Sequence, residues 1–372
     1  MTSLTSSVSS AKKEELDVVG QELLTELLKM RIDKSEEASN KVTDITTDKL
    51  FNKTEKEELG DWTYYKLFGE PASKLPDFNI KVYKDTDWSI EWQTHIPDVT
   101  KFQHYVKDHT VLYPLMLGIQ HNMNTLLTGP TGCGKSSVVE YVCSVIRQPF
   151  FRLNGRQDME SDTLLGKVWV TGGEMKYILG DFSKARRDGC MILWDEVWKV
   201  PSGIQMALQR MYEREGVLQL DDMPGTLEEK QIKPDPRGRL ILADNVVGVG
   251  DGLDKYAATL IQDASTLNRM EMVLTCDYLQ PASEIGMLTA THKHLPNNQA
   301  IKMVQLAGLI RTGFSKGELS STMSPRQLNT WAKLALAVGS YKTAFNYVMK
   351  GRLATTEEQA SLLQLWNTVY KV

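Results

Sequence analysis

The sequence predicts an α/β protein: a core with a five-stranded parallel sheet, preceded by a helical and irregular extension and followed by a helical lid. From about residue 122, short apolar runs bounded by Gly, Pro, Asn or Asp alternate with helical stretches, as in the βαβ units of a buried sheet. Beyond Pro281 only helical periodicity remains. We therefore expect an adaptor region at 1–95, a core at 96–280 and a lid at 281–372.

Five apolar runs of four to six residues predict the strands of the core. They are Asn124–Thr128, Phe150–Leu153, Cys190–Trp194, Arg239–Ala243 and Glu271–Cys276. Three stretches with helical periodicity predict the lid. They are Ile301–Ile310, Arg326–Val338 and Glu357–Tyr370.

The 372 residues carry too little positive charge for a general polyanion binder. There are 43 basic and 47 acidic side chains, which gives a net charge of −4. Residues 1–60 alone hold 9 basic and 13 acidic side chains, so the acidity belongs to the N-terminal region. We therefore expect no nucleic-acid partner, and we expect any polyanion to be bound at a local site.

The region before the core contains two patterns. Apolar residues recur at spacings of three and four, which predicts one face of an amphipathic helix at Leu16, Val19, Leu23, Leu27 and Met30. This face could pack on a second helix of the chain near residues 38–50, or on another protein. Residues 61–100 are rich in aromatic residues, Pro and Asp, and we expect an irregular segment anchored by its rings.

The four cysteines predict a reducing compartment. Cys133, Cys143, Cys190 and Cys276 form no CxxC pair, so we expect free thiols. No apolar window is long enough to span a membrane, and the Ser/Thr-rich N-terminus lacks the apolar stretch of a secretory signal. We therefore expect a cytoplasmic protein with no membrane partner.

A phosphate-binding loop follows the first predicted strand. Gly129-Pro130-Thr131-Gly132-Cys133-Gly134-Lys135-Ser136 fits the pattern GxxxxGK[ST], and the next residues, from Ser137 to Ile146, are helix-like. Its glycines let backbone N–H groups approach the phosphates of ATP, Lys135 reaches the β and γ oxygens, and Ser136 is the expected Mg²⁺ ligand. Cys133 is either a neutral spacer or an oxidisable thiol that could block the loop; we expect the spacer.

Two adjacent carboxylates end the third predicted strand, at Met191-Ile-Leu-Trp-Asp195-Glu196. In P-loop hydrolases, the strand-end Asp binds Mg²⁺ and the following Glu polarises the attacking water. We therefore assign Asp195 to the metal and Glu196 to general-base catalysis. This pair disfavours a small-molecule kinase, which has to exclude water.

Three further residues are candidates for the γ-phosphate. Asn245 follows the fourth strand and can orient the attacking water, although an ordinary turn is the alternative. Arg269 precedes the fifth strand, and Arg326 opens a helix of the lid after Ser324-Pro325. Arginine has a planar charged fork suited to developing phosphoryl charge, and one supplied by a neighbouring subunit would couple hydrolysis to assembly.

This order of motifs resembles the AAA+ ATPases. Within them, it is most similar to the MoxR-like, dynein-related branch and its cobaltochelatase small-subunit (CobS) family. The resemblance is carried by TGPTGCGKSS, LWDEVWKVPSGIQMALQRMYEREGVLQL, LILADNVVGVGDG, LNRMEMV and STMSPRQLNTWA, and extends from about residue 67 to about 350. It implies that Asn245 is sensor 1, Arg269 the finger acting in trans and Arg326 sensor 2. It also implies a homo-oligomeric ring, expected to be a hexamer.

Two segments match insertions of this branch. Lys167–Tyr177 alternates around Gly172-Gly173 and predicts a hairpin. In the family this hairpin lines the ring pore, so Trp169 and Tyr177 could touch a substrate or partner, or pack on their own domain. Residues 216–238 contain acidic residues and three prolines and predict a solvent-facing loop.

We therefore expect an ATP- and Mg²⁺-dependent ring motor that remodels a protein. By resemblance, its partner would be a CobT-like protein with a von Willebrand A-type domain, and the motor could be the ATPase subunit of a metal chelatase. A nucleic-acid motor or loader, or a nucleotide-gated ring scaffold, are the alternatives.

Overall fold

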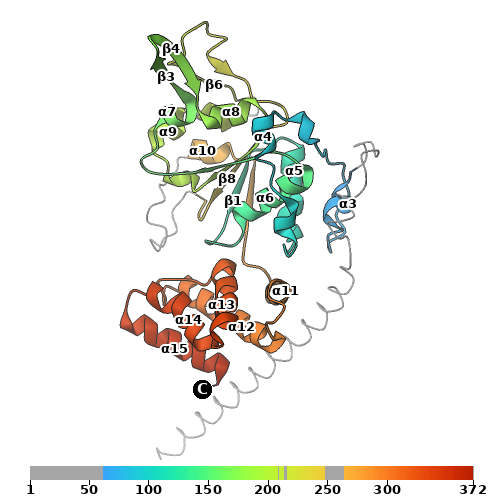
Figure 1. Ribbon diagram of the computed structural model, residues 1–372, viewed down its shortest axis with the longest axis vertical. Coiled ribbons are helices and arrows are strands. Elements are labelled where there is room, and N and C mark those ends of the chain that lie inside the picture. The colour runs from blue at the N-terminus through green and yellow to red at the C-terminus, as the bar shows by residue number, and fades with distance from the viewer. Residues whose placement is uncertain (1–61, 208, 213–215, 248–263, 372) are drawn as a thin grey trace, which may run out of the picture.

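The computed structural model describes residues 62–207, 209–212, 216–247 and 264–371. Figure 1 shows a sheet domain above a helical domain, joined by the chain between β9 (Met272–Thr275) and α11 (Pro281–Thr291). The predicted N-terminal helical stripe lies outside the described residues, so it stays a prediction. Among the helices that are described, none has both the length and the apolar character to cross a membrane.

The central sheet has five parallel strands in the order β2-β5-β8-β1-β9. The strands are β1 (Thr125–Thr128), β2 (Phe150–Asn154), β5 (Met191–Asp195), β8 (Arg239–Asp244) and β9 (Met272–Thr275). Every predicted strand is confirmed, with each boundary displaced by no more than one residue. The prediction succeeds because the central strands are buried on both faces and therefore read as continuous apolar runs.

Helices cover both faces of this sheet, and strand side chains alternate between two cores. Leu193 and Ile241 point to the core that contains α5 (His109–Gln120) and α6 (Lys135–Ile146). Ile192 and Leu242 point to the opposite core, which includes residues of α8. The remaining helical elements of this domain are α3 (Tyr64–Phe68), α4 (Ile90–Gln93), α7 (Ser161–Leu165), α8 (Asp181–Arg187), α9 (Ser202–Ala207), α10 (Ala264–Asn268) and the 3-10 segments Asp85–Asp87, Val99–Phe102, Val197–Lys199 and Gln209–Tyr212.

Residues 62–95 are anchored to the sheet domain by their rings, as the sequence predicts. The Trp88 indole N–H donates to the Arg147 carbonyl (3.0 Å), and the Trp92 indole N–H donates to the Asp188 carboxylate (2.8 Å). Tyr64, Trp88 and Trp92 are all buried. This segment therefore packs as part of the core, while the boundary at residue 95 stays a prediction.

The helical domain contains two more helices than the sequence predicts. Its helices are α11 (Pro281–Thr291), α12 (Asn297–Ser315), α13 (Pro325–Val338), α14 (Tyr341–Met349) and α15 (Thr356–Tyr370), with a 3-10 turn at Lys350–Arg352. Only Glu284 and Leu288 of α11 are buried, so this helix has no apolar stripe to read. The buried residues of α14, Ala344, Phe345, Val348 and Met349, have helical spacing, but the pattern is confined to nine residues, fewer than the window in which periodicity predicts a helix.

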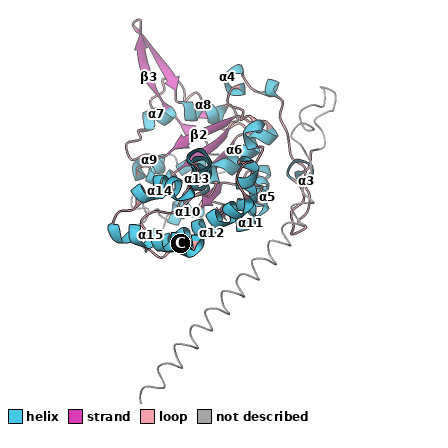
Figure 2. Ribbon diagram, turned by 60° about the horizontal axis from the view of Figure 1, so that its bottom comes forward, coloured by secondary structure: helices cyan, strands magenta, loops and turns pink. Residues whose placement is uncertain are grey.

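The predicted hairpin is confirmed. Strands β3 (Gly166–Thr171) and β4 (Glu174–Leu179) pair antiparallel, and Gly172 and Gly173 have φ values of 63° and 84°, the left-handed pair that a tight hairpin turn needs. The hairpin extends away from the sheet in both ribbon views (Figures 1 and 2).

The expectation of a plain loop at 216–238 is partly wrong. A two-stranded ribbon forms between β6 (Leu218–Gln219) and β7 (Gln231–Ile232), because Leu218, Leu220 and Ile232 are buried against the domain. The acidic residues lie on the exposed tip, as predicted. These are Asp221, Asp222, Glu228 and Glu229.

Candidate functional site

The phosphate-binding loop lies between the end of β1, the end of β9 and the helical domain. Gly129 (φ 145°) and Gly132 (φ 76°) have positive φ values. A Cβ on Gly129 would lie 1.9 Å from the Cys276 carbonyl oxygen, and one on Gly132 would lie 2.5 Å from the Ser324 Cβ. Both glycines are therefore required by close packing as well as by backbone conformation.

The Lys135 side chain is held beneath the loop, where the residue is only 7% exposed. Its ammonium donates to the carbonyls of Gly129 (2.6 Å) and Pro130 (3.2 Å), and to the Asn245 side-chain oxygen (3.0 Å). The structure thus brings together Lys135 and Asn245, which are 110 residues apart in sequence. A cation in this position can meet phosphate oxygens at the mouth of the loop.

Ser136 and Asp195, the two residues that the sequence assigns to Mg²⁺, also meet. The Ser136 hydroxyl donates to an Asp195 carboxylate oxygen at 2.7 Å. A hydroxyl at the start of α6 and a carboxylate at the end of β5 are hard oxygen donors, so these residues fit Mg²⁺ and would hold it together with phosphate oxygens. The same carboxylate oxygen accepts from the Arg152 guanidinium, an ion pair that the sequence analysis missed.

Glu196 follows Asp195 in a left-handed backbone conformation, with φ at 55°. This conformation costs a non-glycine residue on the order of 1 kcal/mol and is typical of active sites. Its carbonyl lies against Gly155, where an added Cβ would come within 2.1 Å of the carbonyl oxygen. The carboxylate is partly exposed and forms an ion pair with Lys199 at 3.1 Å, so it is available to a water molecule beside the phosphate loop.

Asp244 is a positioning residue that sequence reasoning missed. It is buried at the end of β8, where its carboxylate accepts from the backbone N–H of Trp198 (2.9 Å) and of Asn245 (2.7 Å). Burial raises the pKa of Asp244, while these backbone N–H groups and Lys135 oppose the rise. Asp244 therefore links Trp198, two residues after Glu196, to Asn245, which contacts Lys135.

The helical domain touches the phosphate loop through a chain of side chains. The Tyr278 hydroxyl donates to the Thr131 carbonyl (3.1 Å), and the Arg311 guanidinium lies 4.1 Å from the centre of the Tyr278 ring. Arg311 also makes two contacts with the buried Glu284, at 2.6 and 2.9 Å. None of these residues was predicted, because the contacts join positions far apart in the chain.

Arg326 and Arg269 lie in different places relative to the loop. Arg326 is exposed in the first turn of α13, next to Ser324, whose side chain crowds Gly132. Arg269 lies before β9, and its carbonyl accepts from the Asn124 side chain (3.5 Å), before β1 begins. Because β1 and β9 are parallel, this is the edge of the sheet opposite the loop, about 13 Å away along a four-residue strand.

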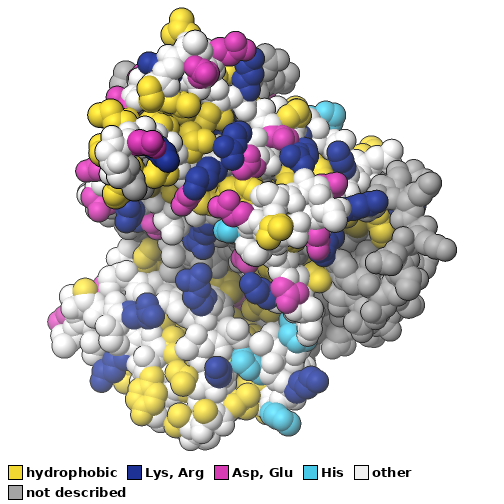
Figure 3. Space-filling model, turned by 45° about the horizontal axis from the view of Figure 1, so that its top comes forward, with side chains coloured by type: hydrophobic (Ala, Val, Ile, Leu, Met, Phe, Trp, Pro, Cys, Tyr) yellow, Lys and Arg dark blue, Asp and Glu magenta, His cyan; other side chains and the backbone are white. Residues whose placement is uncertain are grey.

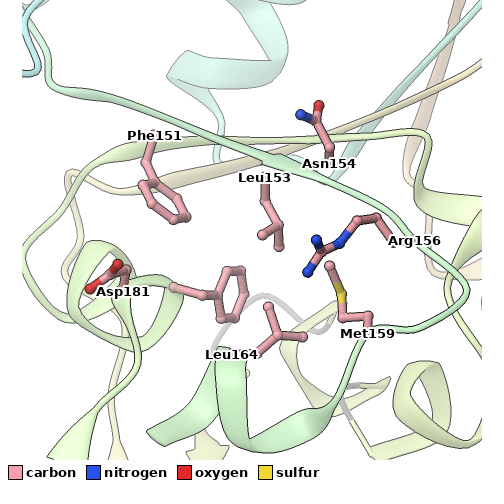
Figure 4. A pocket seen from close by; sticks show the side chains of 8 residues that line it. Phe151, Leu153, Asn154, Arg156, Met159, Leu164 and Asp181 are labelled. Carbon is pink, nitrogen blue, oxygen red and sulfur yellow. The ribbon is translucent and has the colours of Figure 1, made fainter.

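A separate cavity of about 270 Å³ lies between β2, α7 and α8. Figure 4 shows Leu153, Leu164 and Met159 converging on it from different elements, with Arg156 and Asp181 at its sides. It contains none of the residues assigned to phosphate or metal, so it is distinct from the loop site.

Two family models match the chain: the AAA domain of the dynein-related subfamily at residues 124–261, and the CbbQ/NirQ/NorQ C-terminal domain at residues 284–369. Aerobic cobaltochelatase subunit CobS of Sinorhizobium sp is 29% identical over 289 residues, which covers 73% of this chain and 85% of CobS. Protein NorQ of Paracoccus denitrificans is 27% identical over 206 residues, covering 55% of this chain and 71% of NorQ.

An uncharacterised protein of Staphylococcus epidermidis is 32% identical over 268 residues, covering 69% of this chain and 94% of that protein. Among solved structures, the RuvB Holliday junction branch migration motor of Thermotoga maritima aligns with a TM-score of 0.39 and 13% identity, over 73% of each chain. The family models and the sequence relatives agree with the motif order and the sheet described above. The chain belongs to the MoxR-like, dynein-related branch of the AAA ATPases.

Proposed function

We propose that this chain is an ATP-hydrolysing ring motor that remodels a protein partner. The observation that carries the proposal is the meeting of Lys135, Ser136, Asp195 and Asn245 at the carboxyl edge of one sheet. These side chains come from the ends of two different strands and from the loop itself, and together they can bind a triphosphate with its metal.

The proposed reaction is hydrolysis of the γ-phosphoryl group of ATP. Lys135 and the loop N–H groups hold the phosphates. Ser136 and Asp195 would hold Mg²⁺, which would supply positive charge to the phosphate oxygens. Glu196 accepts a proton from the attacking water, and Asn245 orients that water while it keeps contact with Lys135.

The position of Arg269 supports a ring. An arginine at the opposite edge of the sheet is too far from its own loop to touch the same phosphate, and a neighbouring copy could present it there. We propose a hexamer, in which each site is completed by Arg269 of the next subunit.

Hydrolysis by the purified chain should require Mg²⁺ and should depend on assembly. The rate per chain should rise at least several-fold between nanomolar and micromolar protein, because an incomplete site lacks its finger. Ring size is measured in parallel by mass photometry. A rate per chain that stays constant while the oligomer dissociates contradicts the shared site.

The exposed hairpin is the surface that we propose for the protein partner. Val168, Trp169, Val170, Met175 and Ile178 are exposed apolar residues, and Met175 reaches 75% exposure. Hydrophobic side chains gather on this side of the molecule in Figure 3. An exposed apolar cluster of this kind marks a binding surface. Similarity to CobS supports a CobT-like partner with a von Willebrand A-type domain, and a chelatase role is the finer form of this proposal.

The double substitution Val170→Ser and Met175→Ser should abolish partner binding while basal ATP hydrolysis stays within about twofold of wild type, because each residue is exposed on a hairpin that extends away from the sheet. The measurement is a pull-down from the native host with the Glu196→Gln protein held in its ATP state, with and without the two hairpin changes. A partner recovered equally by both proteins places the binding surface elsewhere.

A further inference from the structure

A pair of cysteines links the phosphate loop to the end of β9. Cys133 lies inside the loop and is partly buried, and Cys276 follows β9 and is 4% exposed. They are 143 positions apart in the sequence, yet a single point, the place of a Cβ on Gly129, lies 3.3 Å from the Cys133 sulfur and 1.9 Å from the Cys276 carbonyl oxygen, and both residues contact the same apolar core. The two remaining cysteines, Cys143 and Cys190, are fully buried.

The surroundings of the pair leave little free space. The Cys276 N–H donates to the Thr128 carbonyl (2.7 Å), and the Cys276 carbonyl oxygen lies where a Cβ of Gly129 would be. The Cys133 sulfur lies 3.3 Å from the position that a Cβ of Gly129 would take. The backbone of the phosphate loop at Gly129 and the backbone of Cys276 after β9 are therefore in direct contact beside the two thiols.

The two thiols have different chemical character. Interaction with the Cys276 side chain lowers the pKa of Cys133 to about 7, and the charge of Lys135 adds to this effect against the opposing effect of burial. Interaction with the Cys133 side chain and burial raise the pKa of Cys276. Burial also raises the pKa of Cys143 and of Cys190. Cys133 is therefore the nucleophilic thiolate of the pair, and Cys276 is the neutral donor beside it.

We propose that Cys133 and Cys276 are an oxidisable dithiol that switches nucleotide binding in response to hydroperoxides. The Cys133 thiolate attacks the O–O bond and becomes a sulfenic acid, while the alkoxide leaves and takes a proton as the alcohol. The Cys276 sulfur then attacks the Cys133 sulfur, the S–O bond breaks, and the hydroxide leaves with the Cys276 proton as water. Two thiols and one hydroperoxide thus yield one disulfide, one alcohol and one water.

The disulfide should weaken nucleotide binding for a geometric reason. It fixes the two sulfurs about 2.05 Å apart. Because Gly129 already lies against the Cys276 carbonyl, the whole loop cannot move closer to Cys276 when the disulfide forms. The backbone at Cys133 has to move instead. The N–H groups of this loop are the phosphate ligands, so their displacement lowers affinity for ATP. Transient disulfides of this kind are compatible with a reducing compartment.

The test uses the reduced full-length chain treated with hydrogen peroxide. Peptide mass mapping should find a bond between Cys133 and Cys276, with Cys143 and Cys190 unmodified, and affinity for a fluorescent ATP analogue should fall at least tenfold. Dithiothreitol should restore it. Absence of this bond, or its formation with unchanged affinity, overturns the proposal.

Two variants sharpen the result. In Cys276→Ser, dimedone should trap a sulfenic acid at Cys133, and prolonged peroxide should leave a loss that dithiothreitol does not reverse, since no thiol resolves the intermediate. Cys190→Ala is the matched control and should behave as wild type. If Cys276→Ser does not fold, the peptide mass mapping and the ATP-analogue affinity of the wild-type chain still test the proposal. The dithiol proposal rests on the proposed nucleotide site. A reduced chain that binds ATP without hydrolysing it contradicts the proposed ATP-hydrolysing motor but leaves the dithiol switch standing.

Discussion

Glu196→Gln should bind ATP with near wild-type affinity and hydrolyse it at least about 100-fold more slowly, because the amide cannot accept the proton of the attacking water. The change keeps the size of the side chain, and the affinity rests on Lys135, Ser136 and the loop backbone instead. Pre-steady-state binding of a fluorescent ATP analogue and phosphate release at saturating ATP separate the two effects.

Two controls define this expectation. Glu228→Gln makes the same chemical change on the exposed tip of the β6–β7 ribbon and should leave turnover within about twofold of wild type. Lys199→Met removes the cation 3.1 Å from the Glu196 carboxylate and tests whether that ion pair holds the base in place. Turnover of Glu196→Gln at the wild-type rate would remove Glu196 from its assigned role.

The sheet and the ends of its strands could be predicted from the sequence because they depend on local patterns. A strand buried on both faces reads as an apolar run, as in Met191–Asp195, and the chemistry of the site lies at the residues that directly follow such runs. The phosphate loop is equally local, since its glycines, Lys135 and Ser136 are contiguous. Parallel pairing then brings these ends to one edge of the sheet.

The residues that the sequence did not predict act through contacts between distant positions. Arg152 is a single charge within β2, and nothing near it indicates that it pairs with Asp195 on the neighbouring strand. Glu284 lies on a helix without an apolar stripe, so its buried ion pair with Arg311 has no local signal. Cys276 and Cys133 are separated in the sequence by most of the core domain. They come close only because β9, which precedes Cys276, lies next to β1, which precedes the phosphate loop.

The second large effect concerns the subunit interface. Arg269→Ala should lower turnover by about 10³-fold or more while affinity for ATP persists, because a finger stabilises charge that develops in the transition state. The residue lies at the edge of the sheet opposite its own phosphate loop, so the loss falls on the site of a neighbouring chain.

Mixing experiments can tell whether this finger acts across the interface. When Arg269→Ala chains are combined with Glu196→Gln chains, a site with an intact Glu196 can receive an intact Arg269 from its neighbour at about a quarter of the interfaces in an equal mixture. Turnover should therefore reappear, although each variant alone is inactive. Arg326→Ala is the matched control: it lies in the helix whose cap, Ser324, packs on Gly132 of the same chain, so mixing it with Glu196→Gln should restore nothing. Mixed rings that contain both chains and stay inactive at every ratio would place the finger within its own subunit.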